Sequence, residues 1–68
     1  MKNSKEIKTN KAVVLMSYYT PVAAEIEGNY FKTEEKYSVT TTKHVNSWLG
    51  NIKAEIKSQD FFDQLLED

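Results

Sequence analysis

The single histidine, His44, is the residue around which most catalytic or metal chemistry would have to be built. A serine nucleophile needs a base and a group that orients the base, and no spacing in the sequence suggests such a set. One histidine without cysteine does not make a zinc site, and no acidic loop has calcium spacing. The adjacent Glu34 and Glu35 would point to opposite faces of a strand. We therefore expect a protein that is not an enzyme and that uses no metal or cofactor.

The segment from residue 37 to residue 46 combines groups that could bind an anion. Its threonine hydroxyls can cap a helix, which is the simpler interpretation. Capping does not explain why Lys43 and His44 stand at the positive end of the helix dipole, where acidic residues are favoured. Helix-start amides and these side chains could hold a phosphate or a partner's carboxylate, although His44 packed on Trp48 is an alternative. The predicted anion site consists of Thr41, Thr42, Lys43 and His44.

Tyrosines are concentrated in the part of the sequence that predicts a sheet. On its outer face they could stack unpaired bases or contact a protein, and the alternative is that most pack in a small core. Four glutamates lie among them, where a nucleic-acid binder would carry basic residues, so protein binding fits better. The tyrosines of this predicted surface are Tyr18, Tyr19, Tyr30 and Tyr37.

Two stretches of the sequence predict the strands that would carry these tyrosines. Residues 12–16 are wholly apolar, which suits a strand covered on both faces, and Thr20-Pro21 interrupts it with a turn, a bulge or an edge crossing. Residues 22–36 predict a hairpin with Gly28-Asn29 as its two-residue turn. The expected pairs are Glu27 with Tyr30, Ile26 with Phe31, Glu25 with Lys32 and Ala24 with Thr33. One face of the hairpin would then carry Val22, Ala24, Ile26 and Phe31.

After Tyr37 the apolar residues recur at helical spacing. The pattern predicts a long helix over residues 41–57, in which Gly50 is either tolerated on the solvent side or splits the helix in two. Ser58 can cap a short final helix with Asp60 in its first turn. The long stripe consists of Val45, Trp48, Leu49, Ile52 and Ile56, and the short one of Phe61, Phe62, Leu65 and Leu66.

The expected fold class is α+β, with a three-stranded antiparallel sheet followed by one long and one short C-terminal helix packed on it. Residues 12–68 would form this single domain. Residues 1–11 hold only Met1 and Ile7 as apolar side chains, so we expect a flexible basic arm there. A core this small makes a homodimer through an uncovered sheet edge plausible.

The net charge of −1 conceals an uneven distribution of charge along the chain. Residues 1–11 carry four lysines against one glutamate, whereas residues 54–68 carry five acidic residues against one lysine. The chain has no arginine, so forked recognition of phosphate or guanine is absent. Asp60, Asp63 and Glu67 could instead meet a basic surface on a protein partner. No apolar run is long enough to cross a membrane, so a cytoplasmic protein is expected.

Two motifs of the chain resemble those of a known family. They are Ser17-Tyr18-Tyr19-Thr20-Pro21-Val22-Ala23 and Tyr37-Ser38-Val39-Thr40-Thr41-Thr42-Lys43-His44-Val45-Asn46. They are similar to motifs of a family of very small uncharacterised proteins of bacteriophages and related mobile elements, over roughly residues 15–49. There, a Ser-Tyr-x-Thr-Pro-Val-Ala strand precedes a hairpin and a Tyr-Ser-x-Thr-Thr-(Ser/Thr)-(Lys/Arg)-His motif precedes a helix. The resemblance implies a phage or prophage setting, in which tiny proteins bind and redirect or inhibit larger host machinery.

We therefore expect a small non-catalytic binding protein, a phage-type accessory or counter-defence (inhibitor) factor that docks on a host or phage protein in the host cytoplasm. The alternative is a weak nucleic-acid-binding protein that uses the lysine arm, Lys43 and the sheet tyrosines. The predicted partner-binding residues are Tyr18, Tyr19, Tyr30, Tyr37, Lys43, His44, Asp60, Asp63 and Glu67.

Overall fold

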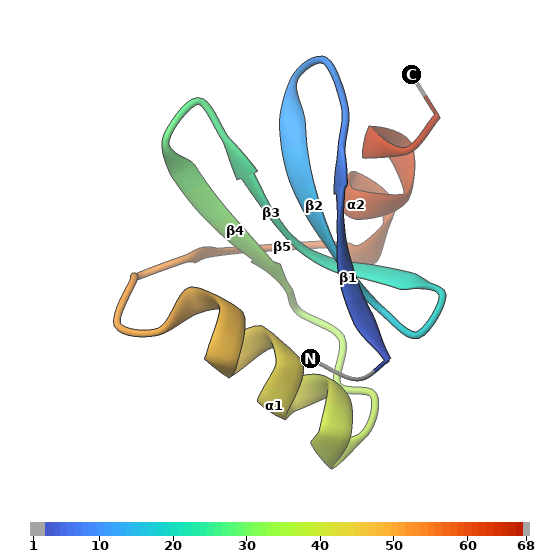
Figure 1. Ribbon diagram of the computed structural model, residues 1–68, viewed down its shortest axis with the longest axis vertical. Helices are drawn as coiled ribbons and strands as arrows, with labels where there is room; N and C mark the ends of the chain where they lie inside the picture. The colour runs from blue at the N-terminus through green and yellow to red at the C-terminus, as the bar shows by residue number, and fades with distance from the viewer. Residues whose placement is uncertain (1–2, 68) are drawn as a thin grey trace.

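The computed structural model describes residues 3–67. It shows a five-stranded sheet with one helix on each face (Figure 1). The strands follow one another across the sheet in the order β1 to β5. The first four are antiparallel neighbours, and β5 pairs with β4 in parallel after the chain has crossed over through α1. The elements are β1 (Ser4–Lys8), β2 (Ala12–Ser17), β3 (Thr20–Ile26), β4 (Asn29–Thr33), α1 (Val39–Leu49), β5 (Glu55–Lys57) and α2 (Gln59–Leu65).

The α+β class is confirmed, but the sheet has five strands rather than the expected three. The expectation of a flexible arm is wrong for residues 4–8, which form β1 and pair with β2 from Ser4 opposite Ser17 to Lys8 opposite Val13. Ile7 packs against the core, and the Trp48 indole donates a hydrogen bond to the Glu6 carboxylate at 2.6 Å. An edge strand needs few apolar side chains, because backbone pairing supplies much of what holds it. Met1 and Lys2 of the expected arm lie outside the described residues.

The hairpin between β3 and β4 exists, but its turn lies one residue earlier than predicted. Glu27 and Gly28 are its central residues, with φ angles of 51° and 84°, as a type I′ turn requires. Each β3 residue therefore faces a β4 residue two positions earlier than expected, so that Ala24 is opposite Phe31. The expected Glu25–Lys32 pair is wrong, and the Glu25 carboxylate instead accepts a hydrogen bond from the Gly28 amide at 2.6 Å.

A shift of two residues leaves every side chain on its original face, because side chains alternate along a strand. Ala24, Ile26 and Phe31 accordingly share one face, as predicted. Val22 does not join them, because the register between β2 and β3 shifts next to it, where Leu15 is opposite Ala23 and Met16 opposite Pro21. This bulge turns Val22 to the other face of the sheet.

The core consists of two clusters that meet at the sheet. Neighbouring residues of β2, Val14 and Leu15, belong to different clusters, and both side chains are fully buried. The prediction that this strand is covered on both faces is confirmed. The cluster on the α2 side contains Ala12, Val14, Met16, Ala24 and Phe62, and the cluster on the α1 side contains Leu15, Val22, Ala23, Val45 and Leu49.

Helix α1 is shorter than the predicted long helix. It ends at Leu49, where Gly50 adopts a positive φ of 61° and its amide donates to the Asn46 carbonyl. The predicted continuation to residue 57 is wrong, because residues 55–57 form β5 instead and Ile52 and Ile56 are exposed. The cap is Ser38 rather than one of the threonines. Ser58 occupies the N-cap position of α2, as predicted, without a side-chain capping bond.

The role of α2 as the cover of one sheet face can be tested at Phe62, whose side chain is fully buried. Removing it should lower the free energy of unfolding by about 3–5 kcal/mol, because a large cavity would remain. We expect urea titrations at 25 °C to show that Phe62→Ala unfolds at a much lower urea concentration than the wild type. Leu66→Ala, at the exposed end of the same helix, should change stability by less than about 1 kcal/mol. Equal losses in the two variants would contradict this packing.

Candidate functional site

A buried polar network joins the end of β2 to α1. The Ser17 hydroxyl lies 2.8 Å from His44 Nδ1 and 3.0 Å from the Thr41 hydroxyl. Only 2% of Ser17 and 5% of His44 are exposed, so these hydrogen bonds are shielded from water. The network extends to the start of α1, where the Ser38 hydroxyl donates to Thr41 Oγ1 at 3.3 Å and accepts from the Thr41 amide at 3.1 Å.

One consistent set of donors satisfies all of these groups. Ser38 donates to Thr41, Thr41 can donate to Ser17, and Ser17 can donate to Nδ1 of a neutral His44. Among residues 3–67 no buried side-chain nitrogen or oxygen lacks a hydrogen-bond partner. A fully satisfied buried network fixes the relative position of its elements, because any displacement would leave polar groups unpaired.

Exposed aromatic and aliphatic side chains surround this network. Tyr18 and Tyr19 form the turn between β2 and β3, at the lower right of Figure 1, and 92% of Tyr19 is exposed. The Tyr18 ring lies 5.9 Å from the His44 ring. The hydrogen bonds from Ser17 through Thr41 to Ser38 connect this turn to the start of α1. The two residues that flank Ser38, Tyr37 and Val39, are exposed, Val39 to 73%. We call the set of Tyr18, Tyr19, Tyr37 and Val39 the aromatic surface.

The backbone is strained at Tyr18, one residue of the aromatic surface. Tyr18 has a φ of 58°, a conformation that favours glycine and that a bulky side chain rarely adopts. Strain of this kind persists only where surrounding contacts enforce it, and it is concentrated at functional positions. Here the Tyr18 amide donates to the Asn3 carbonyl at 2.7 Å, and Ser17 is held by the buried network.

Gln59, the first residue of α2, holds Tyr37 in place. The Tyr37 hydroxyl and the Thr33 hydroxyl both donate to Gln59 Oε1, at 2.8 Å and 2.9 Å. The Gln59 amide donates to the Pro21 carbonyl at 2.7 Å and to Asp63 at 3.1 Å. One side chain thereby connects α2, β3, β4 and the segment that carries the aromatic surface.

The remaining residues of the predicted partner surface lie on several elements, and of these Asp63 is near Tyr37. Tyr30 is half-buried, with its ring 5.7 Å from that of Trp48, and His44 is buried. Lys43 is exposed on α1. Exposed acidic side chains occupy α2 and the residues after it, on the other face of the sheet. These are Asp60, Asp63 and Glu67.

The four residues of the predicted anion site do not surround a common point. Thr41 and His44 are turned inward to Ser17, whereas Thr42 and Lys43 are exposed. Thr42 lines a pocket between α1 and the β4–α1 connection, and Lys43 does not line that pocket. The alternative expectation is that His44 packs on Trp48. The His44 ring instead lies beside Tyr18, and Trp48 pairs with Tyr30.

Sequence reasoning missed Ser17, Ser38, Val39 and Gln59. Ser17 carried a recognisable signal, because it is a small polar residue at the end of an otherwise apolar strand that is covered on both faces. A buried hydroxyl in that position requires a partner. Gln59 carried no such signal, since its four partners come from three other elements or connections and from its own helix.

The Ser17–His44 pair has the composition of a nucleophile and its base, but its geometry favours a structural role. The hydroxyl is buried and already contacts two side chains, so it has no open path to a substrate. Within residues 3–67, no three metal-binding side chains are grouped as a metal site would require. Neither of the described helices is long and apolar enough to cross a membrane.

Fold and site together define a small α+β protein with an exposed aromatic surface. The chain belongs to the family of unknown function DUF8033, whose profile matches residues 1–64. No curated protein and no solved structure matches it.

The buried network makes a specific prediction for Ser17. Ser17→Ala would leave the Thr41 hydroxyl and His44 Nδ1 without their buried partner, which should lower the free energy of unfolding by about 1–3 kcal/mol. Urea denaturation measures this loss. Ser47→Ala, on the exposed side of α1, should change stability by less than about 0.5 kcal/mol. If Ser17→Ala is as stable as the control, the network does not hold β2 to α1.

Ionisation of Tyr37 should lower the free energy of unfolding at alkaline pH. Partial burial raises the pKa of its phenol, and repulsion from Glu35 and Asp63 raises that pKa further. The folded protein thus holds this proton more tightly than the unfolded chain. The resulting stability is fully present below the unfolded pKa of about 10 and is lost as the pH rises through the folded pKa.

The measurement compares urea unfolding of the wild type and Tyr37→Phe at neutral and strongly alkaline pH. Lysine titration is common to both proteins, so the wild type should lose more stability than Tyr37→Phe. An identical loss in the two proteins would show that the Tyr37 pKa is not raised by folding.

Proposed function

We propose that this protein is a non-catalytic binding protein that docks on a larger protein through the aromatic surface. The observation that supports this most directly is the exposure of Tyr18, Tyr19, Tyr37 and Val39 around one buried, satisfied network. Tyrosine is enriched at the centres of protein interfaces, where it contributes a large apolar area and a hydroxyl. Tyr37, whose hydroxyl is already bonded to Gln59, loses little conformational entropy on association.

The strained turn supports the same function. Glycine at position 18 would adopt the φ of 58° without a steric penalty, whereas tyrosine adopts it at an energetic cost. A costly residue at an exposed turn makes sense where its ring is needed for contact with a partner. Tyr19, the other residue of this turn, exposes 92% of its surface to a partner.

The biological setting that we propose is a bacteriophage or mobile element within a bacterial host. The two resembling motifs supply the components of one site, since the first contributes Ser17 and the turn tyrosines and the second contributes Ser38, Thr41 and His44. In that setting the protein would act in the host cytoplasm as an accessory or counter-defence factor that inhibits or redirects the protein it binds.

Weak binding of single-stranded nucleic acid is the second candidate function. Tyr19 presents its ring to solvent, and exposed aromatic rings stack on unpaired bases. Exposed Lys43 lies on the same helix as His44 and could contact a phosphate. Such binding would weaken steeply with added salt, because it releases counterions.

Site-specific photo-crosslinking in a bacterial host tests the proposal. A photoreactive phenylalanine analogue in place of Tyr19 should give one dominant protein adduct, because this side chain lies at the centre of the contact. The same analogue at exposed Lys53, in the α1–β5 connection, is the matched control and should give none. Equal labelling from both positions, or a nucleic-acid adduct alone, would contradict docking on a protein.

With the captured protein in hand, affinity measurements follow. Tyr19→Ser should weaken binding by at least about tenfold, as expected for a central aromatic residue. Its stability should be unchanged, because 92% of the side chain is exposed. Ile52→Ser, which removes an exposed apolar side chain elsewhere, should leave the affinity unchanged.

A further inference from the structure

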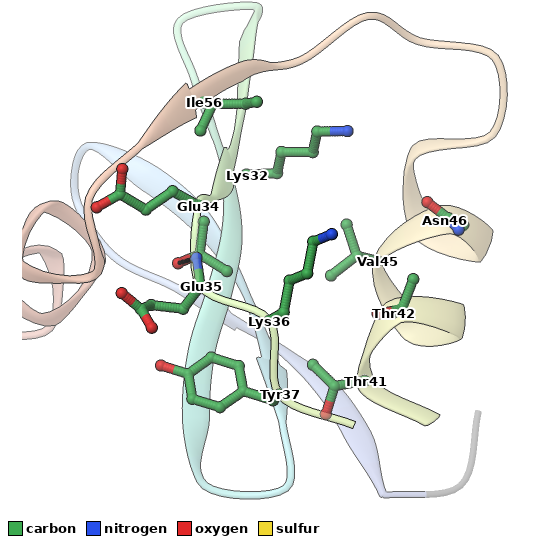
Figure 2. A pocket seen from close by; sticks show the side chains of 11 residues that line it. Lys32, Glu34, Glu35, Lys36, Tyr37, Thr41, Thr42, Val45, Asn46 and Ile56 are labelled. Carbon is green, nitrogen blue, oxygen red and sulfur yellow. Dashed lines mark hydrogen bonds between the residues drawn. The ribbon is translucent and has the colours of Figure 1, made fainter. Parts of the chain in front are cut away.

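A pocket of ≈ 260 Å³ lies between α1 and the segment that leads from β4 into this helix. Figure 2 shows the side chains of Lys32, on β4, and of Lys36, in that segment, extending toward α1. Helix α1 contributes Thr42, Val45 and Asn46 to the opposite wall. Thr42 and Asn46 are four residues apart and therefore lie on the same face of the helix.

Two lysines and two glutamates line this pocket, and the lysines extend toward α1. Among residues 3–67, neither Lys32 nor Lys36 forms an ion pair. Glu34 and Glu35 also border the pocket, but Figure 2 shows their carboxylates directed away from α1 and from the two amino groups. Two ammonium groups that face one hollow without a counterion repel each other, so the site favours an anion.

The apolar and polar side chains of the pocket indicate what kind of group would carry the anion. Val45 gives the pocket an apolar floor, and Ile56 of β5 borders it with 59% of its surface exposed. The Thr42 hydroxyl and the Asn46 amide can donate hydrogen bonds. The volume is below that of typical pockets for drug-sized ligands, so it suits a group about as large as one amino-acid side chain.

We propose that this pocket binds a carboxylate or phosphate group carried on a small apolar body. The amino groups of Lys32 and Lys36 neutralise the anion, Thr42 and Asn46 donate to its oxygens, and Val45 and Ile56 contact the apolar body. This differs from the anion site expected from the sequence, which included Lys43 and His44. Thr41 and Thr42 of the expected site line this pocket.

The pocket deepens the proposed function, because Tyr37 belongs to both the aromatic surface and the pocket lining. An anionic side chain of the docked protein could enter the pocket while its neighbours contact the tyrosines. The inference rests on the proposed function only in this last step. Binding of a small anion can be measured without any protein partner, so failure here is distinguishable from failure of protein docking.

The test titrates the full chain with small probes and follows backbone amide shifts by NMR. Phenyl phosphate and phenylacetate carry the two anions on the same apolar ring, and their relative affinities tell which anion is preferred. Phenylacetamide is the neutral control, and inorganic phosphate lacks the apolar body. We expect saturable shifts at Thr42 and Asn46 with at least one of the two aromatic anions, and affinities at least about fivefold weaker for both controls, as the loss of one favourable contact implies.

Three variants assign the site. Lys32→Gln and Lys36→Gln should each weaken binding of the preferred anion by about fivefold, with a smaller effect at high salt because ions screen exposed charges. Lys43→Gln is the matched control, since Lys43 is exposed on α1 but does not line the pocket, and it should bind like the wild type. Circular dichroism confirms that each variant is folded.

Several outcomes would overturn the inference. They are the absence of saturable shifts with every probe, equal affinity for phenylacetamide, and equal affinity for inorganic phosphate. Loss of binding in Lys43→Gln, with Lys32→Gln and Lys36→Gln unaffected, would place the anion at the helix start instead.

Discussion

The structure depends on one strand, β2, whose side chains are buried on both faces of the sheet. A chain of 68 residues can enclose little apolar volume, and covering a single strand from both sides uses that volume efficiently. Val14 belongs to the core cluster under α2, and its neighbour Leu15 belongs to the core cluster under α1. Each helix therefore packs against the same central backbone, and β2 couples the two faces mechanically.

The polar end of β2 is where this constraint meets the candidate site. Ser17 is buried like the apolar residues before it, so its hydroxyl must find partners within the protein, and Thr41 and His44 provide them. The same hydrogen bonds that satisfy Ser17 fix the start of α1 beside the strained Tyr18 turn. The hydrogen bonds of Ser17 therefore both bury His44 and position the turn that exposes Tyr18 and Tyr19.

The aromatic surface and the lysine pocket are adjacent because both depend on the segment between β4 and α1. Gln59 anchors this segment through Tyr37, and Ser38 anchors it through the helix cap. On either side of these anchors, Lys36 faces α1 and Val39 faces solvent. The lysine side chains point toward α1, whereas the Glu35 and Asp63 carboxylates lie near the Tyr37 hydroxyl, so a protein partner would meet both signs of charge beside the tyrosines.

Alternation and turn chemistry allowed the sequence alone to determine the α+β class, the doubly covered strand at residues 12–16, the presence of the β3–β4 hairpin and the shared face of Ala24, Ile26 and Phe31. These features are local, since each depends on residues close together in the chain. Tertiary structure decided the rest. Residues 4–8 and 55–57 become strands only because an existing sheet offers them backbone partners, and Gly50 ends α1 by a conformation that its helical spacing does not reveal. The site was decided in the same way, because Ser17 and His44 are 27 residues apart and a hydrogen bond at that separation leaves no periodic pattern in the sequence.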